Sequence, residues 1–289
     1  ALMGKRFNYT VSATLGDNKT VFTKFNNPEK NLSNHYEGKV LGEIWGYRVD
    51  GLFASDEEAA EYTSKINQDA VNERILTDKV DPYYRAGDLK FRDLDGDNVI
   101  SKGDDTAYDA GDREIIGNET PRYMYSFRLG ADWNGFDLGI FFQGVGKRDW
   151  YPNYLSTGFW GPYSRAFTSF IPENFMDQCW SEENRDGYFP RFRGYHTFAG
   201  SQLGVNNDRY LQDASYIRLK NLTVGYTLPV LKKVFTKLRV YFTGENLWYW
   251  SPMLKHTKYI DPEAAGGNGN TGMAYNYSRN FSVGVDITF

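Results

Sequence analysis

The chain has 289 residues, of which 17% are aromatic and 24% charged, and its formal net charge at pH 7 is −4. Without a basic patch or stripe it offers no electrostatic surface for nucleic acid, and its single cysteine, Cys179, excludes an internal disulfide framework or a cysteine-based zinc site. A mean hydropathy of −0.60 beside so many aromatic rings fits either a transmembrane β-barrel or a soluble β-sandwich with a tyrosine-rich face.

Apolar and polar residues alternate strictly in several segments, which is the pattern of a strand with one apolar face. The alternation predicts seven long strands, at 3–15, 19–27, 122–133, 135–147, 214–228, 237–248 and 279–289. Asn134-Gly135 predicts a type I′ hairpin between two of them, and a change of parity near Lys220 predicts a bulge. No run of about 18 apolar residues occurs, so the sequence predicts no membrane-spanning helix.

Short and long connections alternate between these strands. The turns at 16–18 and 134–135 and the stretch 229–236 are short, whereas the intervals 28–121, 148–213 and 249–278 are long. Outer-membrane barrels have short periplasmic turns and long extracellular loops, whereas a sandwich would show turn signals every 8–12 residues. The pattern therefore predicts an all-β fold, a transmembrane antiparallel β-barrel with three long extracellular loops.

Strand parity adds an expectation about the extent of the barrel. If the tight turns are periplasmic, the first and last strands both run inward, but a complete bacterial barrel has an even number of strands. The start of the chain, ALMGKRFNYT, does not have the pattern of a signal peptide. Residues 1–289 are therefore expected to be the C-terminal part of a larger barrel domain.

The long intervals carry local structure of their own. Ser55 and Glu58 have the spacing of a capping box, which predicts a helix through about Ile75. The run GGNGN at 266–270 predicts a flexible loop tip.

Six motifs follow one another in a fixed order: GEIWGYRVDGLF (42–53), GDLKFRDLDGDNVISKGD (87–104), REIIGNETPRYMYSF (113–127), ASYIRLKNLTVGYTLP (214–229), ENLWYWS (245–251) and the closing strand RNFSVGVDITF (279–289). Together they resemble the C-terminal half of the SusC/RagA-type TonB-dependent transporters of the Bacteroidetes outer membrane, from about Lys5 to Phe289.

The resemblance implies a barrel of about 22 strands with an N-terminal plug domain. It also implies TonB-driven import of a large oligosaccharide or oligopeptide across the outer membrane of a Gram-negative bacterium, with a SusD-like surface lipoprotein as partner and lipid around the barrel. The plug, the TonB-contacting segment and the signal sequence of that family are not found in this chain.

An acidic loop at 93–105 is the strongest candidate for a metal site. Asp93, Asp95 and Asp97 alternate as the first ligands of a calcium loop do, Val99 would offer its carbonyl, and Asp104 would close the loop. Asn98 tolerates the positive φ that such a loop requires, and Ile100 would anchor it. Structural calcium is one interpretation, and an acidic turn that holds only water is the other.

A cluster of aromatic residues follows the fourth predicted strand. Trp150, Tyr154, Trp160 and Tyr163 could contact substrate at a barrel mouth, pack against a lid protein, or form an interfacial girdle. A girdle is also the favoured interpretation of Trp248, Tyr249 and Trp250. The three histidines have neither zinc-ligand nor triad spacing, so no catalytic residue and no enzymatic activity are predicted.

Two alternatives remain open from the sequence. The first is a secreted or surface β-rich protein, stabilised by calcium, that binds glycans or mediates adhesion. The second is a complete small barrel, which needs an eighth strand hidden in 28–121, with GEIWGYRVDGLF as the only candidate.

Overall fold

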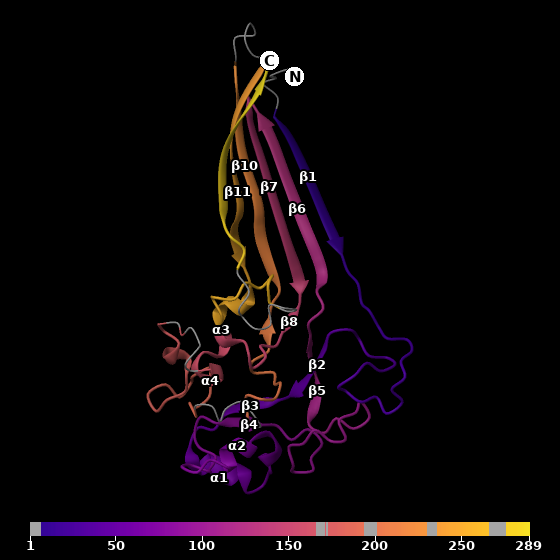
Figure 1. Ribbon diagram of the computed structural model, residues 1–289, viewed down its shortest axis with the longest axis vertical. Coiled ribbons are helices and arrows are strands. Elements are labelled where there is room, and N and C mark those ends of the chain that lie inside the picture. The colour runs from indigo at the N-terminus through magenta and orange to yellow at the C-terminus, as the bar shows by residue number, and fades with distance from the viewer. Residues whose placement is uncertain (1–6, 166–170, 172, 194–200, 230–235, 266–275) are drawn as a thin grey trace.

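The structure, a computed structural model, describes residues 7–165, 171, 173–193, 201–229, 236–265 and 276–289. Figure 1 shows two parts: a tall sheet of long strands and, at one end of it, a body built from the long connections. We call this second part the loop body (residues 17–121, 148–215 and 251–279). The predicted flexible tip at 266–270 lies outside the described residues.

The tall sheet is entirely antiparallel and runs in the order β1-β6-β7-β10-β11-β12. Its strands are β1 (Asn8–Gly16), β6 (Arg122–Trp133), β7 (Phe136–Lys147), β10 (Tyr216–Leu228), β11 (Lys237–Trp250) and β12 (Asn280–Thr288). The last five lie within two residues of their predicted bounds, because apolar and polar residues alternate along each of them, with one change of parity in β10.

Both local predictions inside the sheet are confirmed. Asn134 and Gly135 have φ values of 47° and 87°, the two positive angles that a type I′ hairpin between β6 and β7 requires. The register of β10 shifts between Leu219 and Asn221 against both of its neighbours, which places the irregularity at Lys220.

The predicted strand at 19–27 is wrong. This segment contributes one isolated bridge, Val21 to Val40, because it folds back on residues 38–41 instead of joining the tall sheet. The Asn27 side chain donates to the carbonyl oxygens of Asn31 and His35 and holds this fold-back closed.

The correction reverses the predicted direction of the first strand. β1 leads into the loop body and is joined to β6 by the long connection 17–121, so it runs from the hairpin end toward the loops (Figure 1). The tall sheet has six described strands instead of seven, and the argument from odd parity fails. Short and long connections still alternate, and the third long connection begins at 251 because β11 continues to Trp250.

Three small two-stranded sheets brace the loop body. They pair β2 (Glu43–Tyr47) with β5 (Arg113–Asn118), β3 (Val49–Leu52) with β4 (Leu89–Phe91), and β8 (Asp149–Trp150) with β9 (Gln212–Asp213). The motif GEIWGYRVDGLF therefore forms β2 and β3 outside the tall sheet, so it is not a hidden strand of that sheet.

Short helical segments complete the loop body: α1 (Asp56–Thr63), η1 (Asp69–Val71), α2 (Glu73–Leu76), α3 (Thr157–Trp160), α4 (Pro162–Arg165), η2 (Met176–Gln178) and η4 (Pro252–Lys255). The Ser55 hydroxyl caps α1 by accepting from the Glu58 amide at 3.1 Å, as predicted. The helix ends at Thr63 instead of Ile75, because Asn67 pairs through its backbone with Asn98 and Ile100 of the acidic loop.

The buried core of the protein lies in the loop body. Its main cluster draws on all three long connections and includes Phe91, Ile100, Trp160, Tyr210 and Ile260. Along the tall sheet, by contrast, most described side chains are exposed or half-buried. Within the part of the chain that the structure describes, no helix is both long and apolar enough to cross a membrane.

Candidate functional site

One face of the tall sheet is apolar across all six strands. The strand register aligns Val11, Leu129, Ile140, Leu222, Gly244 and Phe281 in one row, and Tyr9, Ala131, Leu138, Val224, Phe242 and Val283 in the next. Most of the large side chains in these rows are exposed: Val11 and Val283 are 64% and 76% exposed on the two edge strands, and Leu129 and Val224 are 40% and 42% exposed inside the sheet. A continuous exposed apolar face of this kind marks an interaction with lipid or with another protein.

The opposite face is polar and hydrogen-bonded. Thr14 pairs with Ser126 at 2.6 Å, and Thr223 pairs with Thr243 at 3.2 Å. Toward the hairpin end, the Arg239 guanidinium donates to Asp137 on β7 at 2.6 Å and to Asp286 on β12 at 2.9 Å, so one side chain joins three strands.

Aromatic side chains stand at both ends of the apolar face. Trp133 and Phe136 flank the β6–β7 hairpin and are 56% and 53% exposed, whereas Trp248 and Trp250 lie near the loop body. Membrane barrels carry aromatic girdles at both interfaces. Trp248 and Trp250 lie on the apolar face, where a girdle would need them, whereas Tyr249 lies on the polar face beside Arg218 and does not fit the predicted girdle.

The loop body contacts the polar side of the sheet at β10. At the loop end of β10, Arg218 is buried on that side and forms ion pairs with Asp261 and Glu263 of the third long connection. Tyr249 lies under the same guanidinium, 4.7 Å from it to the ring centre. This buried cluster holds the third connection across the end of the polar face.

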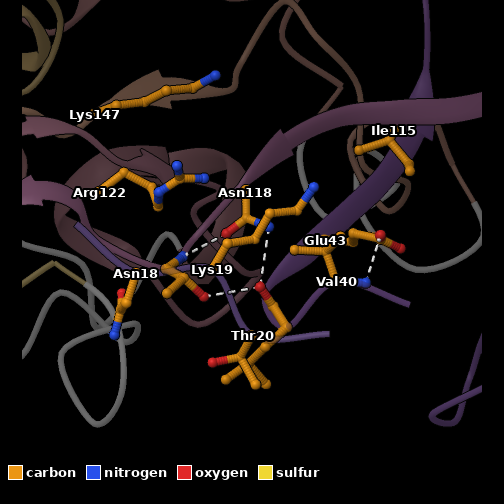
Figure 2. A pocket seen from close by; sticks show the side chains of 11 residues that line it. Asn18, Lys19, Thr20, Val40, Glu43, Ile115, Asn118, Arg122 and Lys147 are labelled. Carbon is orange, nitrogen blue, oxygen red and sulfur yellow. Dashed lines mark hydrogen bonds between the residues drawn. The ribbon is translucent and has the colours of Figure 1, made fainter. Parts of the chain in front are cut away.

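A pocket of about 230 Å³ opens where β1, β6 and β7 meet the loop body (Figure 2). Three cationic side chains line it, from Lys19, Arg122 and Lys147. At its loop end the sheet is therefore covered by the third connection at β10, whereas an open pocket lined by cations lies at β1, β6 and β7.

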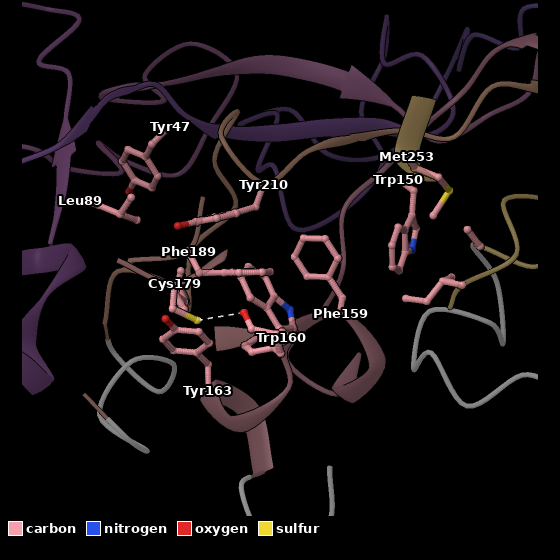
Figure 3. Packing of buried hydrophobic residues seen from close by; sticks show 14 of the residues in the cluster. Tyr47, Leu89, Trp150, Phe159, Trp160, Tyr163, Cys179, Phe189, Tyr210 and Met253 are labelled. Carbon is pink, nitrogen blue, oxygen red and sulfur yellow. Dashed lines mark hydrogen bonds between the residues drawn. The ribbon is translucent and has the colours of Figure 1, made fainter. Parts of the chain in front are cut away.

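Three of the four predicted aromatic contact residues, Trp150, Trp160 and Tyr163, lie in the buried core (Figure 3), and the fourth lies at the surface. Trp160 and Tyr163 are fully buried and Trp150 nearly so, whereas Tyr154 is 60% exposed. Trp160 packs edge-on against Phe159 and Tyr210, with ring centres 4.7 and 5.1 Å apart. Burial removes Trp150, Trp160 and Tyr163 from any contact surface in this structure, and Tyr154 stays a predicted contact residue.

The acidic loop forms a tight turn built on its own carboxylates. Asp93 accepts from the amides of Gly96 and Asn98 at 2.7 and 2.9 Å, and Asn98 has the positive φ, 67°, that the sequence predicts. Ile100 is fully buried and anchors the loop in the core. Asp97 turns back to the Val99 amide at 2.7 Å.

The carboxylates that could hold a cation belong to Asp93, Asp95 and Asp112, whose oxygens lie within 4.8 Å of one another. The predicted ligands Asp97 and Asp104 are not in this group. Asp104 lies instead beside Asp109, and the Asp109 carboxylate accepts a hydrogen bond from the backbone amide of Asp104. Asp112 was missed because it lies beyond a 12-residue calcium loop, although Gly-Asp recurs at 96–97, 103–104 and 111–112.

Asp112 has an electrostatic environment unlike that of an exposed loop carboxylate. Burial, together with the nearby charges of Asp95 and Asp93, raises its pKa, against two amide donors from Ser101 and Leu94 that lower it. A carboxyl group of this kind favours either a proton or a cation beside it.

No protein-family model matches the chain. TonB-dependent receptor P3 of Formosa agariphila is 30% identical over 269 residues, which cover 88% of this chain and 22% of the relative. TonB-dependent receptors P26 and P39 of the same organism are 28% and 26% identical over 70% and 78% of the chain. The chain thus spans about a fifth of the length of these curated relatives.

Among solved structures, that of the RagAB peptide transporter matches 99% of this chain and 28% of its own, with a TM-score of 0.60 and 21% identity. The RagAB peptide importer in its "closed-closed" state matches equally far, with a TM-score of 0.59.

The two-faced sheet and these likenesses place the fold among the TonB-dependent transporters. The chain is a relative of the TonB-dependent receptors along most of its length and shares its fold with the RagAB transporter, which confirms the resemblance that its six motifs carry. Its relatives are named as receptors and transporters, not as enzymes.

Proposed function

We propose that this chain forms part of the wall of a TonB-dependent importer in a Gram-negative outer membrane, with its apolar face on lipid and its polar face on the lumen. The observation that carries the proposal is the inverted distribution of apolar side chains. The tall sheet exposes its apolar rows, while the protein's own core lies in the loop body.

Energetics favour lipid as the partner of this face. Leaving one large apolar side chain in water instead of burying it costs about 1.5–3 kcal/mol, and β12 alone exposes Phe281, Val283, Val285 and Ile287. A soluble domain rarely exposes such a continuous face. In a bilayer the same residues are stabilised, and the aromatic rings at both ends match the two interfaces.

Closure of the sheet into a barrel is part of the proposal. Within the described residues, β1 pairs only with β6 and β12 only with β11, so the outer edge of each strand presents unpaired amides and carbonyls. Lipid cannot satisfy these groups. Further strands must therefore pair with both edges, and a barrel of about 22 strands meets this requirement.

The loop body then lies outside the cell, over the lumen mouth that its third connection already covers. We infer that it meets a SusD-like surface lipoprotein and the cargo there, with Tyr154 as one contact. The cargo is a large oligosaccharide or oligopeptide, and TonB supplies the energy for import. The similar RagAB complex is named a peptide transporter, which favours an oligopeptide.

We also propose that the acidic loop binds structural calcium through Asp93, Asp95 and Asp112. Calcium prefers several carboxylate and carbonyl oxygens. An ion at this position would offset the mutual repulsion of the three carboxylates. It would thereby fix the first long connection beside the core residue Ile100.

The membrane assignment is tested by extraction and gel mobility. An importer wall needs detergent for solubility and migrates differently in SDS gels before and after boiling, because the barrel resists SDS until it is heated. The alternative, a secreted calcium-stabilised binding protein, predicts a soluble protein with a single mobility. A protein that stays monomeric in buffer without detergent would rule out the importer.

A further inference from the structure

The pocket shown in Figure 2 lies at the loop end of the polar face, and the strand register indicates the side on which it opens. Arg122 pairs with Lys147 in the register of β6 and β7, two pairs beyond Ser126 and Gln143 of the polar face. Arg122 and Lys147 therefore lie on the same side of the sheet as Ser126 and Gln143, with the apolar pair Met124 and Val145 between the two polar pairs.

Two of the three cations in this pocket form no ion pair among the described residues, although the carboxylate of Asp149 lies within electrostatic reach of Lys147. Arg122 is held by Asp17, whose carboxylate accepts from its guanidinium Nη2 at 2.6 Å. Lys19 and Lys147 make no hydrogen bond or ion pair with any residue that the structure describes.

The single acid in the lining, Glu43, is already satisfied. Its carboxylate accepts from the Tyr36 hydroxyl at 2.9 Å and from the Val40 amide at 2.8 Å. The pocket thus presents two ammonium groups that no hydrogen bond from the described residues holds, in a chain whose net charge is −4.

The basic character continues down the polar face. Arg128 lies in the row of Ser12 and Phe141, stacks 5.3 Å from the Phe141 ring centre, and forms no ion pair among the described residues. Between this row and the loop end, the polar-face positions of β1, β6 and β7 carry no carboxylate.

We propose that this pocket binds the carboxylate groups of an acidic oligopeptide cargo at the lumen mouth, with Lys19 and Lys147 as the binding residues. The inference rests on the proposed import function and specifies its cargo. An ammonium–carboxylate hydrogen bond is roughly twice as strong as one between neutral groups, and three separate segments deliver the cations to one cavity. Arg128 is the next free cation along the same face.

The rest of the lining favours a peptide over an acidic sugar. Leu41 and Ile115 are 41% and 47% exposed beside the cations, which suits apolar side chains next to acidic ones. None of the described lining residues is aromatic, whereas a ring supplies the flat apolar contact that suits the face of a sugar.

The test measures binding to the detergent-extracted protein by calorimetry. The probes are a hexapeptide with two glutamates and two leucines, the same peptide with glutamines instead of glutamates, and a tri-uronate. We expect the acidic peptide to bind best and the double variant Lys19→Gln/Lys147→Gln to weaken it about tenfold, since each exposed pair contributes up to about 1 kcal/mol. Added salt should weaken the native protein more than the variant.

The matched control is Lys79→Gln/Lys258→Gln, which removes the same charge from exposed lysines that do not line the pocket; it should leave affinity unchanged. Equal binding of the glutamate and glutamine peptides, or an unchanged affinity in the pocket variant, would overturn the site. Tri-uronate binding as tight as that of the acidic peptide would overturn the peptide assignment. Heat-dependent gel mobility of the same preparation reports separately on the import function.

Discussion

The lipid assignment makes a sharp prediction for two neighbouring residues of β12. Val283 and Ser282 point to opposite faces: Val283 aligns with Phe242 in an apolar row, and Ser282 aligns with Thr243 in a polar one. Both lie near the middle of the strand. Replacing each by arginine therefore places the same charge on lipid in one variant and in the lumen in the other.

The expected costs differ by several kcal/mol. An arginine at the bilayer midplane on the lipid face of a barrel lowers the free energy of unfolding by about 2–4 kcal/mol. Val283 lies in an apolar row of the exposed face, so in the proposed barrel its side chain contacts lipid and a cost in this range is expected. Ser282→Arg should cost less than about 1 kcal/mol, because the lumen is hydrated and the side chain can extend into it.

The assay is reversible denaturant unfolding of the barrel in lipid vesicles, followed by tryptophan fluorescence and by gel mobility. Val283→Arg should shift the midpoint clearly to lower denaturant, and Ser282→Arg should not. Equal costs for the two variants, or a larger cost for Ser282→Arg, would refute the assignment of the faces and with it the importer wall.

Three further predictions concern the loop body and the lumen face. Trp160→Ala should destabilise the loop body by about 3–5 kcal/mol, measured by its protease resistance, whereas Tyr154→Ala should leave stability within about 0.5 kcal/mol and weaken only lipoprotein or cargo binding. Asp112→Asn should abolish calcium binding in calorimetry. Because burial raises the pKa of Asp112, calcium protection of residues 85–115 should fade as pH falls through that raised pKa, and pH-independent protection would exclude this role. Arg239→Gln leaves Asp137 without its partner and should cost about 1–2 kcal/mol in the same vesicle unfolding assay; no loss would show that the network is dispensable.

The strands of the tall sheet could be predicted from the sequence because the signals that define them are local. Alternation fixes the faces of a strand within a few residues, and the Asn134-Gly135 dipeptide and the parity change at Lys220 are equally local signals. The strand predicted at 19–27 was wrong because the conformation of this segment depends on its contacts with residues 38–41 and on the hydrogen bonds of the Asn27 side-chain amide. No pattern inside the segment itself reveals those partners.

Which side chains of the loop body are buried could not be predicted from the sequence, because burial there depends on residues far apart along the chain. A tryptophan in a Gly- and Pro-rich loop looks the same whether it meets lipid, cargo or a protein core. Trp160 is buried because Tyr210, fifty residues further along the chain, packs against it. Asp112 completes the acidic cluster in a similar way, since its contact with the 93–105 loop is made by folding and not by loop spacing.

The position of the loop body explains how this protein can tolerate a sheet without a core. In the proposed transporter wall the polar face stays hydrated and the apolar face contacts lipid, so neither face supplies packing within the chain. The three long connections supply that packing among themselves, and the buried Arg218–Asp261 pair fixes the third of them to β10 on the polar side of the sheet. Removing one partner of a buried ion pair costs about 3–5 kcal/mol, so this link holds the third connection across the mouth while the edge at Lys19 and Lys147 stays open. The same architecture thus leaves one side of the mouth covered and the other basic and accessible.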